Sequence, residues 1–209
     1  MQVSADKSLN VAKYNFRLIE NINKLSKVIK SKGVKSLTIR LNNIDHTEQH
    51  LAELLTKAIL NSVNTLTVVG LMRNTNLVIF EKLLTSVINL TISIANLAAL
   101  SVLSSVNSNL ESITITNRIS TIENTHDADF KIFKTLNYFS IRLHEKVFDV
   151  NQSLNKTEYI QEMLKALHNE RKSIAYQVII STAWVNNVTS ILTKSSLYTD
   201  GDQTIVSNV

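Results

Sequence analysis

The sequence predicts an α/β protein in which a parallel sheet forms one layer and helices form the other. A short stretch with two central apolar residues recurs along the chain, and amphipathic helical segments separate its copies. The composition is that of a globular protein, with 44% hydrophobic and 19% charged residues. At 209 residues the chain is long enough for one well-buried core, so we expect a single domain.

Residues 6–31 have the periodicity of an amphipathic helix, and Gly33 follows at the position of a left-handed C-cap. Residues 1–40 contain nine Lys or Arg and two acidic residues, a net charge of +7 in a chain whose total is +5. We expect residues 1–33 to form a basic, amphipathic N-terminal capping helix. Its basic face consists of Lys13, Arg17, Lys24 and Lys27.

The recurring stretch places an apolar residue at its first, fourth and sixth positions, with start-to-start spacings of 29, 24, 23 and 26 residues. The alternation at its end is typical of a short strand, and the first apolar residue fills the corner that leads into it. One such unit cannot bury its apolar face alone, so we expect the units to stack. The copies are 34–39 (VKSLTI), 63–68 (VNTLTV), 87–92 (VINLTI), 110–115 (LESITI) and 136–141 (LNYFSI).

This spacing resembles that of the leucine-rich-repeat family, and the longer units look most like the helix-bearing ribonuclease-inhibitor type. The resemblance covers residues 34–145, and the family's turn asparagine is present once, as Asn42. It implies a short solenoid of five irregular repeats, with a parallel sheet on one face, helices on the other, and helical N- and C-terminal caps.

The connections between the copies agree with an α/β unit. Residues 45–62 start with a capping-box spacing and continue with apolar residues on one helical face, while 76–86 and 97–106 predict two shorter helices. Residues 120–129 are polar and acidic, and a short helix is expected only near 130–135.

The C-terminal part is expected to cap the repeats. Residues 155–172 have the apolar stripe of a second helix, and residues 176–182 are rich in β-formers and predict a final strand. Residues 146–198 are therefore interpreted as a helix-and-strand cap, and residues 199–209 as a loose tail.

No motif supports catalysis, a metal or a cofactor. In the cluster at His46, Glu48 and His50 the glutamate stands one position away from its place in zinc proteases, and a zinc deaminase would need Pro and Cys, which the chain lacks. The acidic residues of 120–129 lack the glycine turn of a calcium loop. The chain is therefore predicted to be non-enzymatic, without metal or cofactor.

The central outward position of every copy carries a small hydroxyl, and the next outward position adds further hydroxyls and two arginines. Threonine also suits a strand for its branching alone. The functional interpretation is a flat, hydrogen-bonding surface for a protein partner. The predicted partner-binding residues are Thr38, Arg40, Thr67, Thr91, Ser93, Thr114, Thr116, Ser140 and Arg142.

The sequence thus predicts a scaffold for protein–protein interaction. Two alternatives remain open: binding of nucleic acid or an acidic surface by the basic N-terminal helix, and a structural subunit that self-associates. The uncharged run 83–110 is interrupted by polar residues, so membrane insertion is not expected. No signal peptide is seen, which favours the cytoplasm or nucleus.

Overall fold

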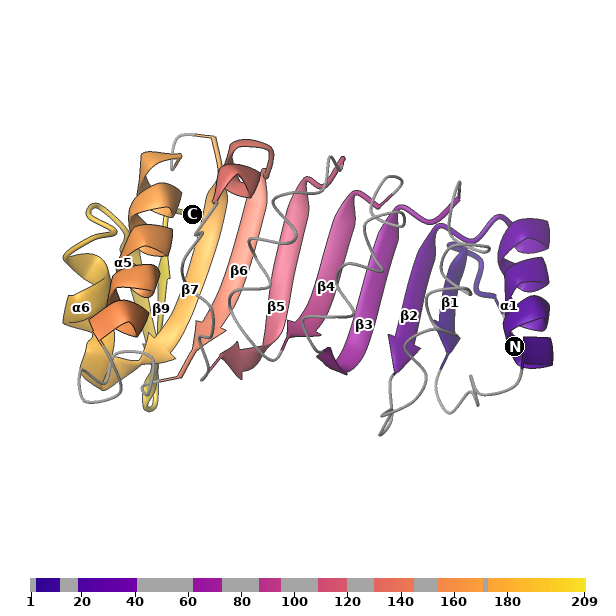
Figure 1. Cartoon of the computed structure of the whole chain (residues 1–209), viewed down its shortest axis with the longest axis horizontal. Helices are drawn as coiled ribbons and strands as arrows, with labels where there is room; N and C mark the ends of the chain where they lie inside the picture. The colour runs from indigo at the N-terminus through magenta and orange to yellow at the C-terminus, as the bar shows by residue number, and fades with distance from the viewer. Residues whose placement is uncertain are drawn as a thin grey trace.

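The computed structural model describes residues 3–11, 19–40, 62–72, 87–94, 109–119, 130–144, 154–170 and 173–209. These residues form an α/β fold around one nine-stranded sheet, in the order β1-β2-β3-β4-β5-β6-β7-β9-β8 (Figure 1). Strands β1 to β7 are parallel, and β9 runs antiparallel to both β7 and β8. The parallel sheet expected from the sequence is confirmed for β1 to β7, and the antiparallel β8 and β9 are an addition to it.

The strands are β1 (Ser8–Val11), β2 (Ser36–Arg40), β3 (Thr65–Met72), β4 (Asn89–Ile94), β5 (Ser112–Ile119), β6 (Tyr138–Leu143), β7 (Ala175–Ser181), β8 (Ser196–Asp200) and β9 (Gln203–Ser207). The described helices are α1 (Ile19–Lys32), α5 (Leu154–Asn169) and α6 (Val185–Thr189), with two 3-10 turns, η1 (Lys131–Lys134) and η4 (Thr182–Trp184).

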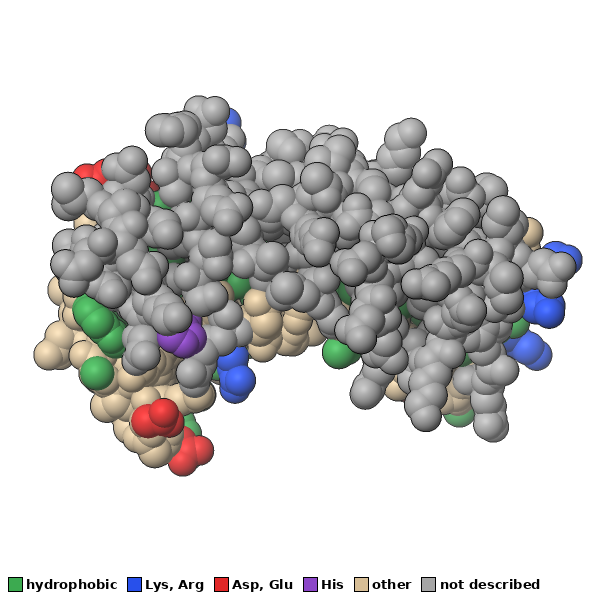
Figure 2. Space-filling view, turned by 60° about the horizontal axis from the view of Figure 1, so that its bottom comes forward, with side chains coloured by type: hydrophobic (Ala, Val, Ile, Leu, Met, Phe, Trp, Pro, Cys, Tyr) green, Lys and Arg blue, Asp and Glu red, His purple; other side chains and the backbone are tan. Residues whose placement is uncertain are grey.

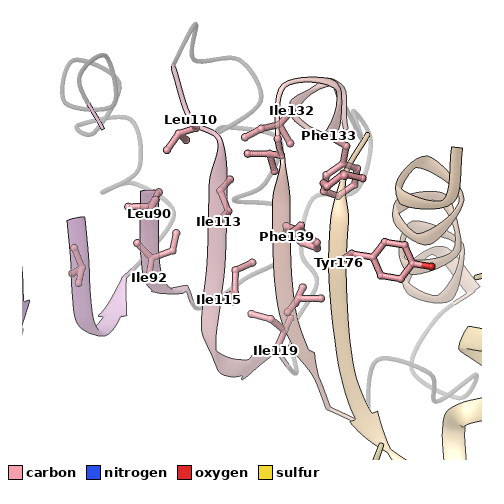
Figure 3. Close-up of a cluster of buried hydrophobic side chains, with 14 of the residues drawn as sticks. Leu90, Ile92, Leu110, Ile113, Ile115, Ile119, Ile132, Phe133, Phe139 and Tyr176 are labelled. Carbon is pink, nitrogen blue, oxygen red and sulfur yellow. The ribbon is translucent and has the colours of Figure 1, made fainter. Parts of the chain in front are cut away.

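One face of the sheet is a continuous apolar core. The two apolar strand positions of each aligned stretch are at most 2% exposed, because alternate side chains of a strand point to the same face. The corner residues of these five stretches, Val34, Val63, Val87, Leu110 and Leu136, are buried as well. Figure 3 shows these side chains on β4 to β7, where Leu90, Ile113, Phe139 and Tyr176 follow one another from strand to strand.

The corners before the strands share one hydrogen-bond pattern. The carbonyl of Lys35 accepts hydrogen bonds from the backbone N–H groups of Asn64 and Thr65, at 2.9 and 3.1 Å. The same two-donor arrangement recurs at every corner from β1 to β6. Each corner is thereby tied to the next by main-chain atoms, which do not depend on side-chain identity. The accepting carbonyls are those of Lys7, Lys35, Asn64, Ile88 and Glu111.

Helix α5 covers the C-terminal part of the apolar face. Its buried residues belong to the same core cluster as Phe139 and Tyr176. Phe130 links the helix to η1, since its ring centroid lies 5.2 Å from that of Tyr159 and 5.9 Å from that of Phe133. Burial in this cluster raises the pKa of Tyr159 to about 12.

The prediction of one helix over residues 6–31 is wrong at its start. Ser8–Val11 forms strand β1, which pairs in parallel with β2, and α1 occupies Ile19–Lys32. Residues 6–11 (DKSLNV) share KSL with the stretch at 34–39 (VKSLTI) and end, like it, on a polar and then an apolar residue, so the strand pattern was present there too. The predicted cap is confirmed: Gly33 has a φ of +59°, and Val34 N–H donates to the Ile29 carbonyl at 3.1 Å.

The loose tail predicted for residues 199–209 is also wrong. Strands β8 and β9 form a hairpin that extends the sheet, with Gly201 at a φ of +59° as the first of two loop residues, the position glycine takes in a type II′ turn. Thr204 is 1% exposed, and its hydroxyl is hydrogen-bonded to the hydroxyls of Thr199 (3.0 Å) and Thr182 (3.1 Å). Pairing with β7 orders this segment, which a local pattern could not reveal.

The strand predicted at 176–182 is confirmed as β7, and the helix predicted at 155–172 as α5, which ends at Asn169. The short helix near 130–135 is the 3-10 turn η1. The helices expected at 45–62, 76–86 and 97–106, the His46 cluster and the acidic stretch 120–129 lie outside the described residues. Within the part of the chain described, no helix has the length and hydropathy needed to span a membrane.

Candidate sheet-face binding site

A row of uncharged polar side chains crosses the whole sheet. The hydroxyl residues predicted to form an outward column, Thr38, Thr67, Thr91, Thr114 and Ser140, are direct Cα partners across β2 to β6. The row then continues to both edges of the sheet. We call it the polar row, and its nine members in sheet order are Asn10, Thr38, Thr67, Thr91, Thr114, Ser140, Gln177, Ser207 and Ser196.

Four members of the polar row were missed from the sequence. Asn10 could have been found, because the stretch 6–11 places it between two apolar positions as in the other copies. Gln177 likewise stands between the buried Tyr176 and Val178. Ser196 and Ser207 join the row only through the antiparallel hairpin, which has no counterpart in the repeated stretch.

The threonines in the middle of the row are accessible. Thr38, Thr67, Thr91 and Thr114 are each partly exposed, whereas the residues before and after them in the strand are almost fully buried. Adjacent strands of a sheet lie about 4.7–4.9 Å apart, so these hydroxyls repeat at that interval. Ser140 is only 6% exposed and contributes little to the surface.

A second row lies two residues earlier in each strand, and it is polar as well. It consists of Ser8, Ser36, Thr65, Asn89, Ser112 and Tyr138. Side chains of this second row make hydrogen bonds across strands: Asn89 Nδ2 donates to Thr65 Oγ1 at 3.5 Å, and the Tyr138 hydroxyl donates to Gln177 Oε1 at 3.1 Å.

The row predicted on the other side of the polar row is interrupted. Sequence alignment places Val69 beside Ser93 and Thr116 beside Arg142, but register shifts in β3 and β5 bring Leu71 opposite Ser93 and Arg118 opposite Arg142. Two extra residues in β3 and in β5 cause these shifts. Ser93 and Thr116 still meet, with their hydroxyl oxygens 3.0 Å apart.

Charged residues lie on β6, inside the sheet, and at the N-terminal end of the sheet. Arg142 is exposed on β6, while the side chain of Arg40 lies outside what the structure describes. At the N-terminal end Lys24 and Lys27 are exposed on α1; Lys13 and Arg17 fall outside the described ranges. Figure 2 shows Lys and Arg side chains at the end that α1 forms.

The chemistry of the polar row is hydrogen bonding without proton transfer, because its members are hydroxyl and amide side chains. Among the described residues, no three His, Asp or Glu side chains are grouped closely enough to hold a metal ion. An open depression between η1 and α5 lies apart from this surface and is lined by charged side chains, including Lys131, Lys134, Glu162 and Lys165.

The comparisons with known proteins add no relative: no protein-family model, curated protein or solved structure matches the chain.

Proposed function

We propose that this chain is a non-enzymatic scaffold of irregular leucine-rich-repeat-like units, and that its uncharged sheet face binds a protein partner. The observation that carries the proposal is the polar row, in which a hydroxyl or amide side chain occupies the same register position on each of nine strands. Strand propensity favours threonine, but it does not favour asparagine, glutamine or serine at Asn10, Gln177 and Ser196.

Two further observations support the repeat interpretation. The parallel strands follow sequence order across the sheet, and the two-donor corner carbonyl recurs from Lys7 to Glu111. Both are expected when successive units stack directly on their neighbours.

The surface favours a polar, uncharged partner. Threonine hydroxyls both donate and accept hydrogen bonds, so a partner can pair with them through amide, hydroxyl or main-chain groups. A partner with a strong net charge would gain little electrostatic binding energy on this surface, because Thr67, Thr91 and Thr114 carry no opposite charge. Polar protein–protein interfaces contain direct hydrogen bonds and bridging water molecules, and a few well-packed residues set most of their affinity.

The test is Thr67→Glu combined with Thr114→Glu. Like charges directly opposite each other would destabilise the sheet. The two chosen positions avoid this, because Thr91 lies between them in the row. We expect loss of the partners that the wild-type chain captures from cells of its source, because each buried carboxylate would have to be desolvated without a counterion.

The matched control adds the same charge elsewhere: Gln161→Glu on α5 with Asn187→Glu on α6, both exposed positions. A photo-crosslinking residue at Thr91 should label the captured partner directly, whereas one at the exposed Lys165 should not. Equal capture by the sheet-face variant, the control and the wild type would refute the proposal.

The basic N-terminal helix supports a second candidate, binding of nucleic acid or another acidic surface. Lys24, Lys27, Lys30 and Lys32 are exposed along α1, and Lys35 follows it. Such binding is strongest at low salt, because it depends on release of counterions from phosphates. Titration of labelled single- and double-stranded nucleic acid at low salt tests this candidate, and the double substitution Lys24→Glu, Lys27→Glu should abolish any binding seen.

A further inference from the structure

The C-terminal edge of the sheet is an uncovered strand. All five residues of β8 are exposed, and β8 is paired only on its β9 side among the described residues. Two large hydrophobic side chains are among them: Leu197 is 54% exposed and Tyr198 is 65% exposed. Natural sheets usually protect such an edge with Pro, Lys or an inward-pointing charge, and β8 has none of these within Ser196–Thr199.

The hairpin geometry decides which main-chain groups of β8 are free. A two-residue loop is closed by a hydrogen-bonded pair, here Asp200 and Gln203, and such pairs alternate along an antiparallel ladder. Tyr198 therefore bonds to Ile205 of β9. The N–H and C=O groups of Leu197 and Thr199 point to the open edge.

From this we infer that two copies of the chain associate through their β8 strands, antiparallel and centred on Tyr198, to form one continuous sheet. In that register Leu197 of each copy faces Thr199 of the other, so all the free main-chain groups of both residues are paired. Tyr198 lies opposite Tyr198 of the other copy, as a non-hydrogen-bonded pair, the type in which the two Cα atoms are closest.

Charge complementarity favours this register and direction. The antiparallel arrangement brings the segment just before β8 of each copy, which carries Lys194, towards the hairpin loop of the other, which carries Asp202, and both residues are exposed. A parallel arrangement would instead place Asp200 against Asp200, which is destabilising. The occupant of this edge is thus a second copy of the chain.

The dimer also aligns the two sheet faces. Tyr198 is in register with Ile205, Ile179 and Arg142, and Arg142 is exposed on the sheet face opposite to the buried Ile141. The two polar rows would then face the same side of one sheet. A five-residue strand pair buries little surface, so we expect a weak, concentration-dependent dimer.

The experiment uses single-cysteine variants, which are unambiguous because the chain contains no Cys. Tyr198→Cys should form a disulfide-linked dimer under mild oxidation, since opposed residues of a closely spaced pair are within bridging distance. Ser196→Cys is the matched control on the same strand and face. In the proposed register it lies four residues out of step with its counterpart, about 13 Å along the strand.

The outcomes separate the alternatives. Cross-linking of Tyr198→Cys but not of Ser196→Cys supports the proposal. Equal cross-linking of both variants would indicate parallel or unspecific contact and would overturn it, as would a strictly monomeric wild-type chain in sedimentation at high concentration.

Charge exchange gives a second measurement that leaves β8 itself unchanged. Lys194→Glu should weaken the dimer by about tenfold, because two exposed ion pairs are replaced by repulsion. The combination Lys194→Glu, Asp202→Lys should restore it. If the combined variant is no stronger than Lys194→Glu alone, the proposed register is wrong. These results do not depend on whether the polar row binds a protein partner.

Discussion

The hydroxyl of Tyr176 lies 2.7 Å from Oγ of Ser195, and this contact joins strand β7 to the segment immediately before the edge strand β8. Ser195 Oγ also lies 2.7 Å from the Leu192 carbonyl and donates its single proton there. The Tyr176 hydroxyl is therefore the donor to Ser195. Because the Tyr176 side chain is fully buried, this hydroxyl depends on Ser195 for a partner.

We predict that Ser195→Ala destabilises the protein more than Tyr176→Phe. The first substitution leaves a buried hydroxyl without its partner, at a cost of about 1–3 kcal/mol, whereas the second removes the donor and costs about 1 kcal/mol. The free energy of unfolding in denaturant measures both. The double variant should cost less than the sum of the two single variants, because Tyr176→Phe removes the hydroxyl that Ser195→Ala would leave without a partner. A fully additive double variant would show that the two hydroxyls do not interact.

Phe139→Ala is expected to cost about 3–5 kcal/mol, because it opens a cavity in the centre of the core. Phe139 is fully buried and its ring centroid lies 4.9 Å from that of Phe133 (Figure 3). Phe139→Leu should cost less than about 1.5 kcal/mol, since the register-equivalent positions on β3 and β4 are Leu66 and Leu90. Thermal unfolding of both variants provides the measurement, and equal losses would contradict this account of the packing.

A matched pair of glycine substitutions tests the left-handed positions of the backbone. Gly33→Ala should destabilise by about 1–2 kcal/mol from backbone strain alone, because φ is +59° and an added Cβ meets no atom within 4 Å. Lys7, at a φ of 63°, is a non-glycine residue in the same region. Lys7→Gly should therefore stabilise by about 0.5–1 kcal/mol, and a loss of stability there would argue against strain at Lys7.

The protein is predicted to lose stability at alkaline pH through Tyr159. Its pKa is raised by burial from 10.0 to about 12 in the folded state, so the unfolded chain loses this proton first. The contribution is fully present below pH 10 and is lost as the pH rises from 10 towards 12. Denaturant unfolding over this range measures it, and Tyr159→Phe is the control. A variant with the same alkaline slope as the wild type would exclude Tyr159 as the cause.

How far the sequence predicts this protein differs from element to element. The apolar alternation at Leu37 and Ile39, and at its equivalents, correctly located the strands from β2 to β6 and the buried side of each. The same rule located β7 from Val178 and Ile180, and Gly33 located the end of α1. These features depend on interactions within one segment, which a local pattern records.

Strand β1 was missed because the helical periodicity from Tyr14 onward was extended back over a four-residue strand that pairs only with β2. The hairpin at β8 and β9 was missed for a related reason. Its side chains on β8 are all exposed, so no burial pattern marks it, and it is ordered by β7. Some of the predicted partner-binding residues have different neighbours from those expected by alignment, because β3 and β5 carry extra residues.

The alternation of apolar residues is enough to show which side chains face the core, and that an uncharged hydroxyl stands between them on β2 to β6. Side-chain alternation follows from the two-residue period of a strand and needs no knowledge of the neighbours. Pairing between distant segments is what brings these hydroxyls, with the amides of Asn10 and Gln177, into one row that ends at the edge strand β8. The register of the strands and the position of the sheet edges arise from pairing between segments distant in sequence. This pairing is made by main-chain hydrogen bonds, which depend little on the identity of the side chains.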